Sequence, residues 1–302
     1  MNLRNFPGIA CVTRPVPHQV KAMAPIAQAL RRAGFRVRET YDRCPPEAIV
    51  FAWGWGWAKE IRQVHRSTVI CCLDHGLFVP RKQYVVTGWQ GLNGFGEHPV
   101  VDDGGERLRR KGWDSVVKPW RKPGINSLLL GQVYNDAAII EAIEDYSAWL
   151  QLQARALEQE GFPVVFRPHP VQARGDVTRY PRVGALSANP NLYTDIEQAR
   201  CAVAMNSNSL LDGFLHGLGD IRLYNRGSML YPISSPTGRL EGQRSPDVHK
   251  RDQLVNRLAY CQWEPEEIES GEWASFHAPI LTRIIEQGGQ HAPWWSSGGY
   301  DA

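Results

Sequence analysis

The sequence lacks the features that mark disulfide-stapled, zinc-binding or membrane-spanning proteins. Its six cysteines are scattered and form no Cys-x-x-Cys pair, so we expect buried free thiols. No apolar run approaches the roughly 18 residues of a membrane helix. The N-terminus also lacks a basic segment followed by a long apolar one. These absences predict a cytoplasmic protein with no membrane span.

Excess charge of either sign is also scarce. Lys and Arg outnumber Asp and Glu by only 3, which gives no case for bulk nucleic-acid binding. Hydrophobic residues make up 43% of the chain, as in ordinary globular proteins. The 302 residues are enough for two domains of about 150 residues each. Tryptophan, by contrast, is abundant, with 11 residues.

Strand-like apolar segments alternate with segments of helical periodicity in both halves of the chain. We expect strands at 8–14, 35–38, 48–53, 68–73, 127–130, 164–167, 201–205 and 220–224. We expect helices at 19–33, 57–65, 193–199, 210–217 and 264–287. A further helix should follow the loop at 131–136 and end at about residue 160. This alternation predicts an α/β fold with two Rossmann-like domains.

The alternation stops between residues 74 and 122, and a Pro-rich basic segment at 118–124 has the character of a linker. We therefore expect an N-terminal domain over 1–123 and a C-terminal domain over 124–262. A C-terminal helix and tail over 263–302 would return toward the N-terminal domain.

Polar residues follow three expected strand ends in the second half of the chain. They are Gln132 and Asp136, Arg167 and His169, and Ser207, Asn208, Ser209 and Asp212. Carboxyl ends of parallel strands bind ligands, and helix starts with free N–H groups hold phosphates. Each set also has a purely structural explanation, such as a Pro-flanked turn or a helix cap. Together they predict a pocket for a nucleotide mono- or diphosphate.

The segments GQVYND (131–136), FRPHP (166–170) and MNSNSLLDGFLHG (205–217) together resemble the motifs of capsular-polysaccharide glycosyltransferases related to the β-Kdo transferases. The resemblance spans about residues 128–231. It implies a GT-B fold, in which two facing Rossmann-like domains enclose a cleft. It also implies a UDP- or CMP-linked sugar donor, held mainly by the C-terminal domain.

The resemblance assigns roles to the motif residues. Donor-phosphate contacts would come from Arg167, His169, Ser207, Asn208 and Ser209. Gln132 and Asp212 would lie near the nucleoside, with Asp136 a further donor-binding candidate. Asp212, expected in the first turn of its helix, stands where the family has glutamate, so the resemblance does not name the sugar.

The sequence contains no Asp-x-Asp motif, the usual means of holding Mg²⁺ or Mn²⁺ on a nucleotide diphosphate. Helix N-termini and cationic side chains would then balance the leaving-group charge. We therefore expect metal-independent transfer, with no metal site and no cofactor beyond the nucleotide sugar.

An acceptor hydroxyl needs a general base, which should come from the N-terminal half. Asp74 is the first candidate, because it ends a buried strand-like run beside Gly76. A loop-capping role for Asp74 is the alternative explanation. Asp102 and Asp103 are further candidates, in what resembles a solvated turn.

Aromatic and basic residues of the first 123 positions suggest an acceptor surface. They are Trp53, Trp55, Trp57, Trp89, Arg109 and Arg110. Aromatic faces stack on sugars and on unstacked bases. Core packing and a solvated basic face explain each residue individually. As a set they allow an acidic glycan or DNA with a hydroxymethylated pyrimidine, the substrate of phage DNA glucosyltransferases.

The predicted function is metal-independent, inverting transfer of a sugar from a nucleotide sugar to an acceptor hydroxyl. A 5-hydroxymethylpyrimidine base in DNA is placed ahead of an acidic glycan as acceptor. A capsule or surface-glycan transferase is the first alternative. A nucleotide-sugar 2-epimerase, which needs no acceptor, and a non-catalytic nucleotide-binding protein are the others.

Overall fold

The computed structural model describes residues 8–42, 45, 47, 49–65, 68–96, 98, 101, 103–134, 136, 139, 143–175, 177–224, 228–230, 235–236 and 248–286. The chain forms two compact units. The first unit comprises Met1–Val101 and Arg257–Ala302, and the second unit comprises Asp102–Asn256.

The first division falls before the basic segment at 118–124, whereas the sequence placed it after that segment. Backbone hydrogen bonds tie this segment to the second unit. The Lys118 N–H donates to the Leu215 carbonyl at 2.7 Å, and the Arg121 N–H donates to the Gly217 carbonyl at 3.0 Å. The segment is therefore part of the second unit and not a linker.

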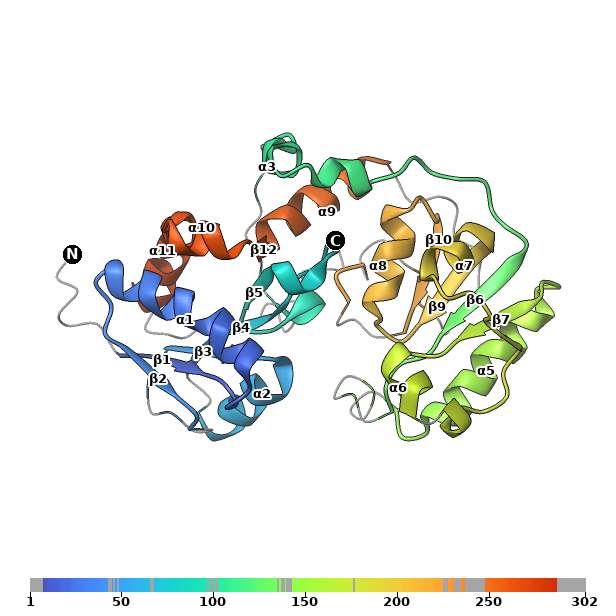
Figure 1. Ribbon diagram of the computed structural model, residues 1–302, viewed down its shortest axis with the longest axis horizontal. Coiled ribbons are helices and arrows are strands. Elements are labelled where there is room, and N and C mark those ends of the chain that lie inside the picture. The colour runs from blue at the N-terminus through green and yellow to red at the C-terminus, as the bar shows by residue number, and fades with distance from the viewer. Residues whose placement is uncertain are drawn as a thin grey trace. The chain divides into compact units, whose positions relative to one another are not determined.

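The first unit is built on a six-stranded sheet (Figure 1). Its strands are β1 (Ile9–Val12), β2 (Val37–Thr40), β3 (Ile49–Trp53), β4 (Val69–His75), β5 (Val85–Trp89) and β12 (Gln262–Trp263). The order is β12-β5-β4-β3-β1-β2, with β1 to β4 parallel. The strand β5 runs antiparallel to β4, and the edge strand β12 runs antiparallel to β5.

Helices cover both faces of this sheet, which explains why β1, β3 and most of β4 are continuously apolar. The helices are α1 (Pro17–Arg32), α2 (Trp55–Val64), α10 (Pro265–Glu269) and α11 (Glu272–Glu286). Residues of α1, α10 and α11 share one core cluster with alternate residues of β1, β3 and β4. The helix α2 contacts β3 and β4. Short 3₁₀ turns lie at Arg81–Gln83 and Asn93–Phe95.

The C-terminal helical region differs from the single helix expected over 264–287. Its two helices, α10 and α11, are separated at Ser270 and Gly271, because Gly271 adopts a left-handed φ of +88°. A further helix that was not predicted, α9 (Val248–Cys261), runs across the division between the units.

The second unit is built on a fully parallel six-stranded sheet. Its strands are β6 (Asn126–Leu130), β7 (Val164–Arg167), β8 (Ala185–Leu186), β9 (Ala199–Ala204), β10 (Asp220–Leu223) and β11 (Ser235–Pro236). The order β11-β10-β9-β6-β7-β8 is doubly wound: the chain steps outward from β6 to β8, then crosses to β9 and steps outward the other way.

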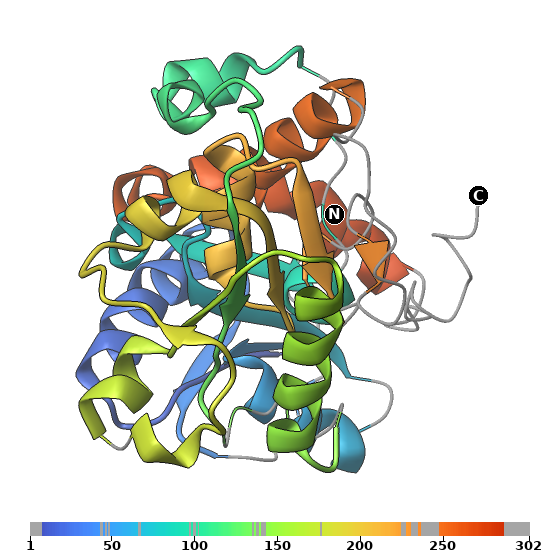
Figure 2. The same ribbon diagram turned by 90° about the vertical axis from the view of Figure 1, so that its right-hand side faces the viewer.

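Helices also pack on this second sheet (Figures 1 and 2). They are α5 (Tyr146–Gln159), α6 (Pro170–Gly175), α7 (Leu192–Gln198) and α8 (Asn208–Leu215). The helix α3 (Glu106–Arg110) and a 3₁₀ turn at Trp113–Val116 precede β6, and a second 3₁₀ turn at Val177–Arg179 follows α6. The apolar side of α5 shares a core cluster with alternate residues of β6, β7 and β9. Both units thus have the predicted α/β character.

Candidate functional site

Three neighbouring strands of the second sheet end at the same edge. The strand β6 lies between β7 and β9, with Leu130 opposite Arg167 and Leu129 opposite Val203. The strand order reverses between β6 and β9, and ligands of doubly wound sheets bind outside the carboxyl ends at such a point. The structure therefore brings the three predicted motif segments to one edge.

A reciprocal hydrogen-bonded pair joins the residues that follow β6 and β9. The Gln132 Nε2 amide donates to Asn206 Oδ1 at 2.7 Å. In return, the Asn206 backbone N–H donates to Gln132 Oε1 at 3.0 Å. Gln132 is buried and was predicted as a site residue, whereas Asn206 was recognised only as part of a polar run. The pair fixes the two segments in register.

Tyr180 joins the residues after β6 to those after β7. Its hydroxyl donates to the Gln132 carbonyl at 2.7 Å and accepts the His169 N–H at 3.4 Å. Burial raises the pKa of Tyr180 to about 12, so the hydroxyl keeps the proton that it donates. Tyr146 accepts the Gln132 N–H at 2.9 Å. Sequence reasoning missed both tyrosines, because they lie far from the motifs along the chain.

His169 is half-buried at the end of the FRPHP segment. Its Nδ1 accepts the Val171 N–H at 3.3 Å, so the proton of the neutral ring lies on Nε2. Burial lowers the pKa of His169, Asp136 opposes this shift and Arg174 adds to it. The arrangement leaves a neutral imidazole whose Nε2–H can donate a hydrogen bond.

The helix α8 begins directly after the β9 exit. Ser207 is its N-cap, and the Ser207 hydroxyl accepts the Ser209 N–H at 3.2 Å. Because the helix begins at Asn208, Asp212 lies in the second turn, and its placement in the first turn was wrong. Asp212 is also only 4% exposed, so its carboxylate faces the protein interior.

The guanidinium of Arg167 is bound within its own unit. It pairs with the buried Asp195 carboxylate and donates to the carbonyls of Asn189 at 2.9 Å and Pro190 at 3.2 Å. These bonds hold the segment before α7 against β7. The expected contact of Arg167 with a donor phosphate stays a prediction.

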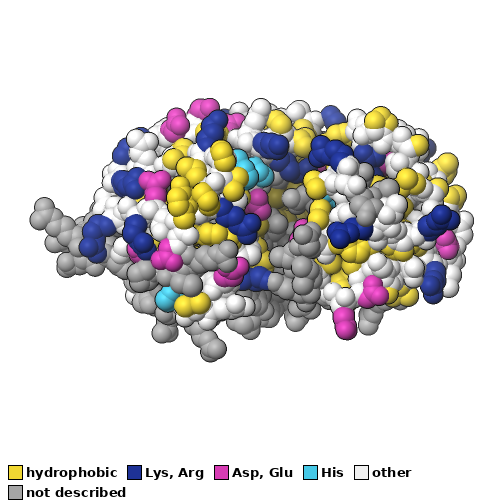
Figure 3. All heavy atoms as spheres, turned by 60° about the horizontal axis from the view of Figure 1, so that its bottom comes forward, with side chains coloured by type: hydrophobic (Ala, Val, Ile, Leu, Met, Phe, Trp, Pro, Cys, Tyr) yellow, Lys and Arg dark blue, Asp and Glu magenta, His cyan; other side chains and the backbone are white. Residues whose placement is uncertain are grey.

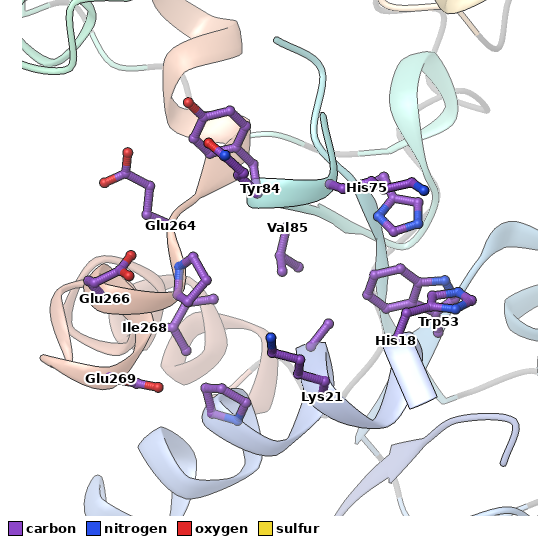
Figure 4. Close-up of a pocket in the computed structure, with 15 residues that line it drawn as sticks. His18, Lys21, Trp53, His75, Tyr84, Val85, Glu264, Glu266, Ile268 and Glu269 are labelled. Atoms are coloured by element: carbon purple, nitrogen blue, oxygen red, sulfur yellow. The ribbon is translucent and has the colours of Figure 1, made fainter. Parts of the chain in front are cut away.

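In the first unit, a pocket of about 780 Å³ lies at the sheet edge where β3 and β4 end (Figure 4). Trp53 and His75, the last residues of these strands, line it together with His18 from the first turn of α1. Figure 4 shows the three rings together at one side, with Glu264 and Glu266 at the opposite side. This pocket was not predicted, although Trp53 was a predicted acceptor residue.

Asp74, the predicted base, is not among the residues that line this pocket. Side chains alternate between the two faces of a strand, so Asp74 and His75 point to opposite faces of β4. The Asp74 Oδ1 also accepts the His75 N–H at 2.7 Å. The Asp103 carboxylate accepts the N–H groups of Gly105 at 2.8 Å and Arg107 at 2.9 Å, and therefore caps the turn into α3. Asp102 lies outside the described residues.

Three of the four predicted acceptor tryptophans, Trp53, Trp57 and Trp89, are buried. Trp89 is 1% exposed and its indole N–H donates to the buried His277, while Trp57 is 6% exposed against the sheet. Trp55, at the start of α2, is partly exposed. Arg109 and Arg110 are exposed but belong to the second unit, so the predicted set is divided between the units.

On the face shown in Figure 3, Lys and Arg side chains lie in separate groups, among acidic and hydrophobic ones.

Within the described residues, no group of three or more His, Cys, Asp or Glu side chains could hold a metal ion. Nor does any helix of the described chain have the length and apolarity to cross a membrane. The five described cysteines are buried free thiols, as predicted, and Cys44 lies outside the described residues.

Comparison with known proteins supports the fold. No protein-family model matches the sequence, and no curated protein matches it. The β-Kdo 2,7 transferase of KpsC from Thermosulfurimonas dismutans has a similar structure, with a TM-score of 0.55 and 14% identity. That match covers 89% of this chain and 99% of the transferase. The β-Kdo 2,4 transferase of the same protein gives a TM-score of 0.52 and 13% identity, over 85% of this chain and 92% of the transferase.

These likenesses, together with the two doubly wound sheets, show that the chain has the GT-B fold of glycosyltransferases. The predicted fold class is confirmed. At this level of identity the likeness concerns the fold alone.

Proposed function

We propose that this chain is a glycosyltransferase that binds a UDP- or CMP-linked sugar on its second unit and transfers the sugar to an acceptor hydroxyl. One observation carries the proposal: a chain of hydrogen bonds from Asn206 through Gln132 and Tyr180 to His169. It joins all three motif segments at the point where the strand order reverses, which is where a doubly wound sheet binds its ligand.

The donor phosphate would lie between His169 and the start of α8. His169 offers its Nε2–H, and the α8 N-terminus offers positive dipole potential together with the side chains of Ser207, Asn208 and Ser209. As the bond from the anomeric carbon to phosphate breaks, negative charge grows on the leaving phosphate. These fixed donors stabilise that charge without a metal ion.

We further propose a single displacement, which inverts the anomeric carbon. The acceptor hydroxyl loses its proton to a general base and attacks the face of the sugar opposite the leaving phosphate. Asp136 and Gln132 are assigned to the nucleoside side of the donor. The buried Asp212 is assigned to supporting α8 rather than to direct contact.

A saccharide is the acceptor that the geometry favours over a DNA base. Three of the four tryptophans proposed to stack on an extruded base are buried, and the paired arginines belong to the other unit. A hydroxymethylpyrimidine in DNA is kept as the second arm of the test.

The experiment is a transfer assay with EDTA present. UDP- and CMP-sugars are offered with acidic and neutral oligosaccharides in one arm, and with hydroxymethylcytosine or hydroxymethyluracil DNA in the other. The proposal predicts sugar on an oligosaccharide at a rate unchanged by added Mg²⁺. Sugar on DNA alone would replace the acceptor class. Conversion of the donor without any acceptor would identify an epimerase, and donor binding with no turnover would identify a binding protein.

A further inference from the structure

Arg167 ends β7 with its side chain on the face of the sheet opposite to that of Phe166. Phe166 packs into the core cluster that includes α5, whereas Arg167 meets Asp195, which belongs to α7. The guanidinium Nη1 pairs with the Asp195 carboxylate and donates to the Asn189 carbonyl at 2.9 Å. The Nη2 group donates to the Pro190 carbonyl at 3.2 Å. One side chain thus fixes the end of β7 to the segment that leads into α7.

The carboxylate of Asp195 is buried, with a side chain that is 2% exposed. Its Oδ1 accepts the Asn189 amide at 2.6 Å, and its Oδ2 accepts the Ser187 hydroxyl at 2.7 Å. A buried carboxylate needs a cationic partner, and Arg167 is that partner. Because Asp195 neutralises the charge of Arg167, little of that charge acts on a phosphate at the sheet edge.

His169 lies two residues beyond the end of β7, and its own contacts are long. Its backbone N–H reaches the Tyr180 hydroxyl at 3.4 Å, and its Nδ1 accepts the Val171 N–H at 3.3 Å. Pro168 and Pro170 flank it and restrict the backbone on both sides. The direction of the imidazole therefore depends on where the end of β7 is held.

We propose that the ion pair of Arg167 and Asp195 is a clamp that positions His169 for the donor phosphate, and that Arg167 does not itself contact the phosphate. The inference rests on the proposed function and concerns the donor site within it. The Arg167 carbonyl also accepts the Gly131 N–H at 2.8 Å, so the same residue ties the end of β7 to the segment of Gln132. Arg167 and Asp195 are positioning residues, because they act through His169.

The first test is calorimetric titration of the nucleotide sugar into Arg167→Gln, Asp195→Asn and the double variant. Each single change breaks the clamp and should raise the donor Kd about 10-fold or more, as expected for partners that orient a ligand-binding histidine. The double variant should bind no more weakly than the single variants, because both changes remove one interaction. If Arg167 contacted the phosphate, Asp195→Asn would free its charge and tighten donor binding, and this result would overturn the inference.

The second test follows His169 in the protein without any ligand. The ring signals of the 9 histidines are recorded by NMR after labelling of histidine, and His169→Gln identifies those of His169. Both clamp variants should shift the His169 signals. The signals of His18, in the first unit, should stay in place and serve as the internal reference.

Arg200→Gln is the matched control for a general loss of stability. Arg200 pairs with Glu160 at 2.6 Å, and its side chain is 20% exposed, against 16% for Arg167. It lies at the start of β9, at the sheet edge opposite the donor site. Arg200→Gln should lower the free energy of unfolding without changing the donor Kd or the His169 signals. Weaker donor binding in this control would show that lost stability, and not positioning, explains the effect.

A milder variant keeps the test informative if the clamp variants fold poorly. Arg167→Lys retains a positive charge for Asp195 but loses the planar fork that reaches the carbonyls of Asn189 and Pro190. Its donor Kd and its His169 signals should lie between those of the wild-type protein and of Arg167→Gln. A wild-type Kd together with wild-type signals in Arg167→Lys would remove the carbonyl contacts from the clamp.

The outcomes separate the inference from the proposed function. Unchanged donor affinity in both clamp variants would overturn the inference alone, whether or not the His169 signals shift. Weaker binding in Arg167→Gln together with unchanged His169 signals would also overturn it. Absence of nucleotide-sugar binding by the wild-type protein would overturn the proposed function, and the inference with it.

Discussion

Gln132 and Asn206 hold each other through two hydrogen bonds, although 74 residues separate them in the sequence. The side-chain amide of Gln132 donates to the side-chain Oδ1 of Asn206 and accepts the backbone N–H of the same residue. Both residues lie at the edge of the parallel sheet where its strand order reverses. The pair therefore shapes the surface on which we place the donor.

Breaking this pair should weaken both the fold and donor binding. Gln132→Ala removes both hydrogen bonds to the partly buried Asn206, which costs about 1–3 kcal/mol of unfolding free energy. Asn206→Ala removes only the Oδ1 acceptor, and we expect a smaller loss. Urea denaturation of both single variants and of the double variant measures the coupling between the two side chains, expected at about 0.5–3 kcal/mol. Strict additivity of the two single losses would contradict the arrangement.

His169→Ala should weaken the binding of the nucleotide sugar by about 1.5–3 kcal/mol, because it removes a hydrogen bond to a charged phosphate. Calorimetric titration with CMP- and UDP-sugars measures the change. His216→Ala is the matched control, since His216 caps the opposite end of α8 and stacks on Tyr193. Equal donor affinity in the two variants would remove His169 from the site.

The buried ion network of the second unit should dominate the stability of that unit. Arg222 is fully buried and pairs with Glu160 and with Asp220 at 2.7 Å, while Arg200 also reaches Glu160 at 2.6 Å. Glu160→Gln leaves Asp220 as the remaining charged partner of the buried Arg222, so we expect a loss of about 1.5–3 kcal/mol in urea denaturation.

The control for Glu160→Gln is an ion pair at the surface of the first unit. Glu47 pairs with Arg38, which is 45% exposed. Glu47→Gln should cost at most about 1 kcal/mol, because water screens this pair. Comparable losses in the two variants would show that burial does not govern these interactions.

His98 should make the first unit sensitive to acid. Burial lowers the pKa of His98 to about 4, and nearby Arg257 adds to the shift. The unfolded state binds a proton near pH 6.5 and the folded state only near pH 4. The free energy of unfolding therefore falls as the pH drops through this window, by up to about 3 kcal/mol from His98.

His98→Gln tests this account of acid sensitivity. Glutamine keeps a donor for the Asn93 carbonyl, which lies 2.8 Å from His98 Nε2, but it does not titrate. Unfolding measured between pH 7 and pH 4 should show a smaller decline for the variant than for the wild-type protein. An identical decline would assign the acid sensitivity to other groups.

The parallel strands could be predicted from the sequence because burial on both faces makes them continuous apolar runs ending in polar residues. The segment 164–167 was placed at its observed limits, and most other strands within a few residues. The antiparallel pairing of β12 with β5 could not be predicted. It joins Gln262 to Val86, and no local pattern encodes a contact over such a separation.

The residues of the candidate site also differ in whether the sequence could predict them. Gln132 and His169 carry motif signals and could be found in the sequence. Tyr180, which joins their segments, lies in an irregular stretch and gives no signal until the chain is folded. The tryptophans show the same limit, because their spacing does not reveal that Trp53, Trp57 and Trp89 are all buried in the folded chain.

The most direct test of the account is calorimetric titration of CMP- and UDP-sugars, with EDTA present, into the wild-type protein and into Gln132→Ala, His169→Ala and His75→Gln. The account predicts saturable binding of one nucleotide sugar to the wild-type protein. Binding should be weaker in the first two variants, whose changes lie in the second unit, and unchanged in His75→Gln. Equal affinity in all four proteins, or no binding by the wild-type protein, would contradict the placement of a nucleotide-sugar site at the β6–β7–β9 edge.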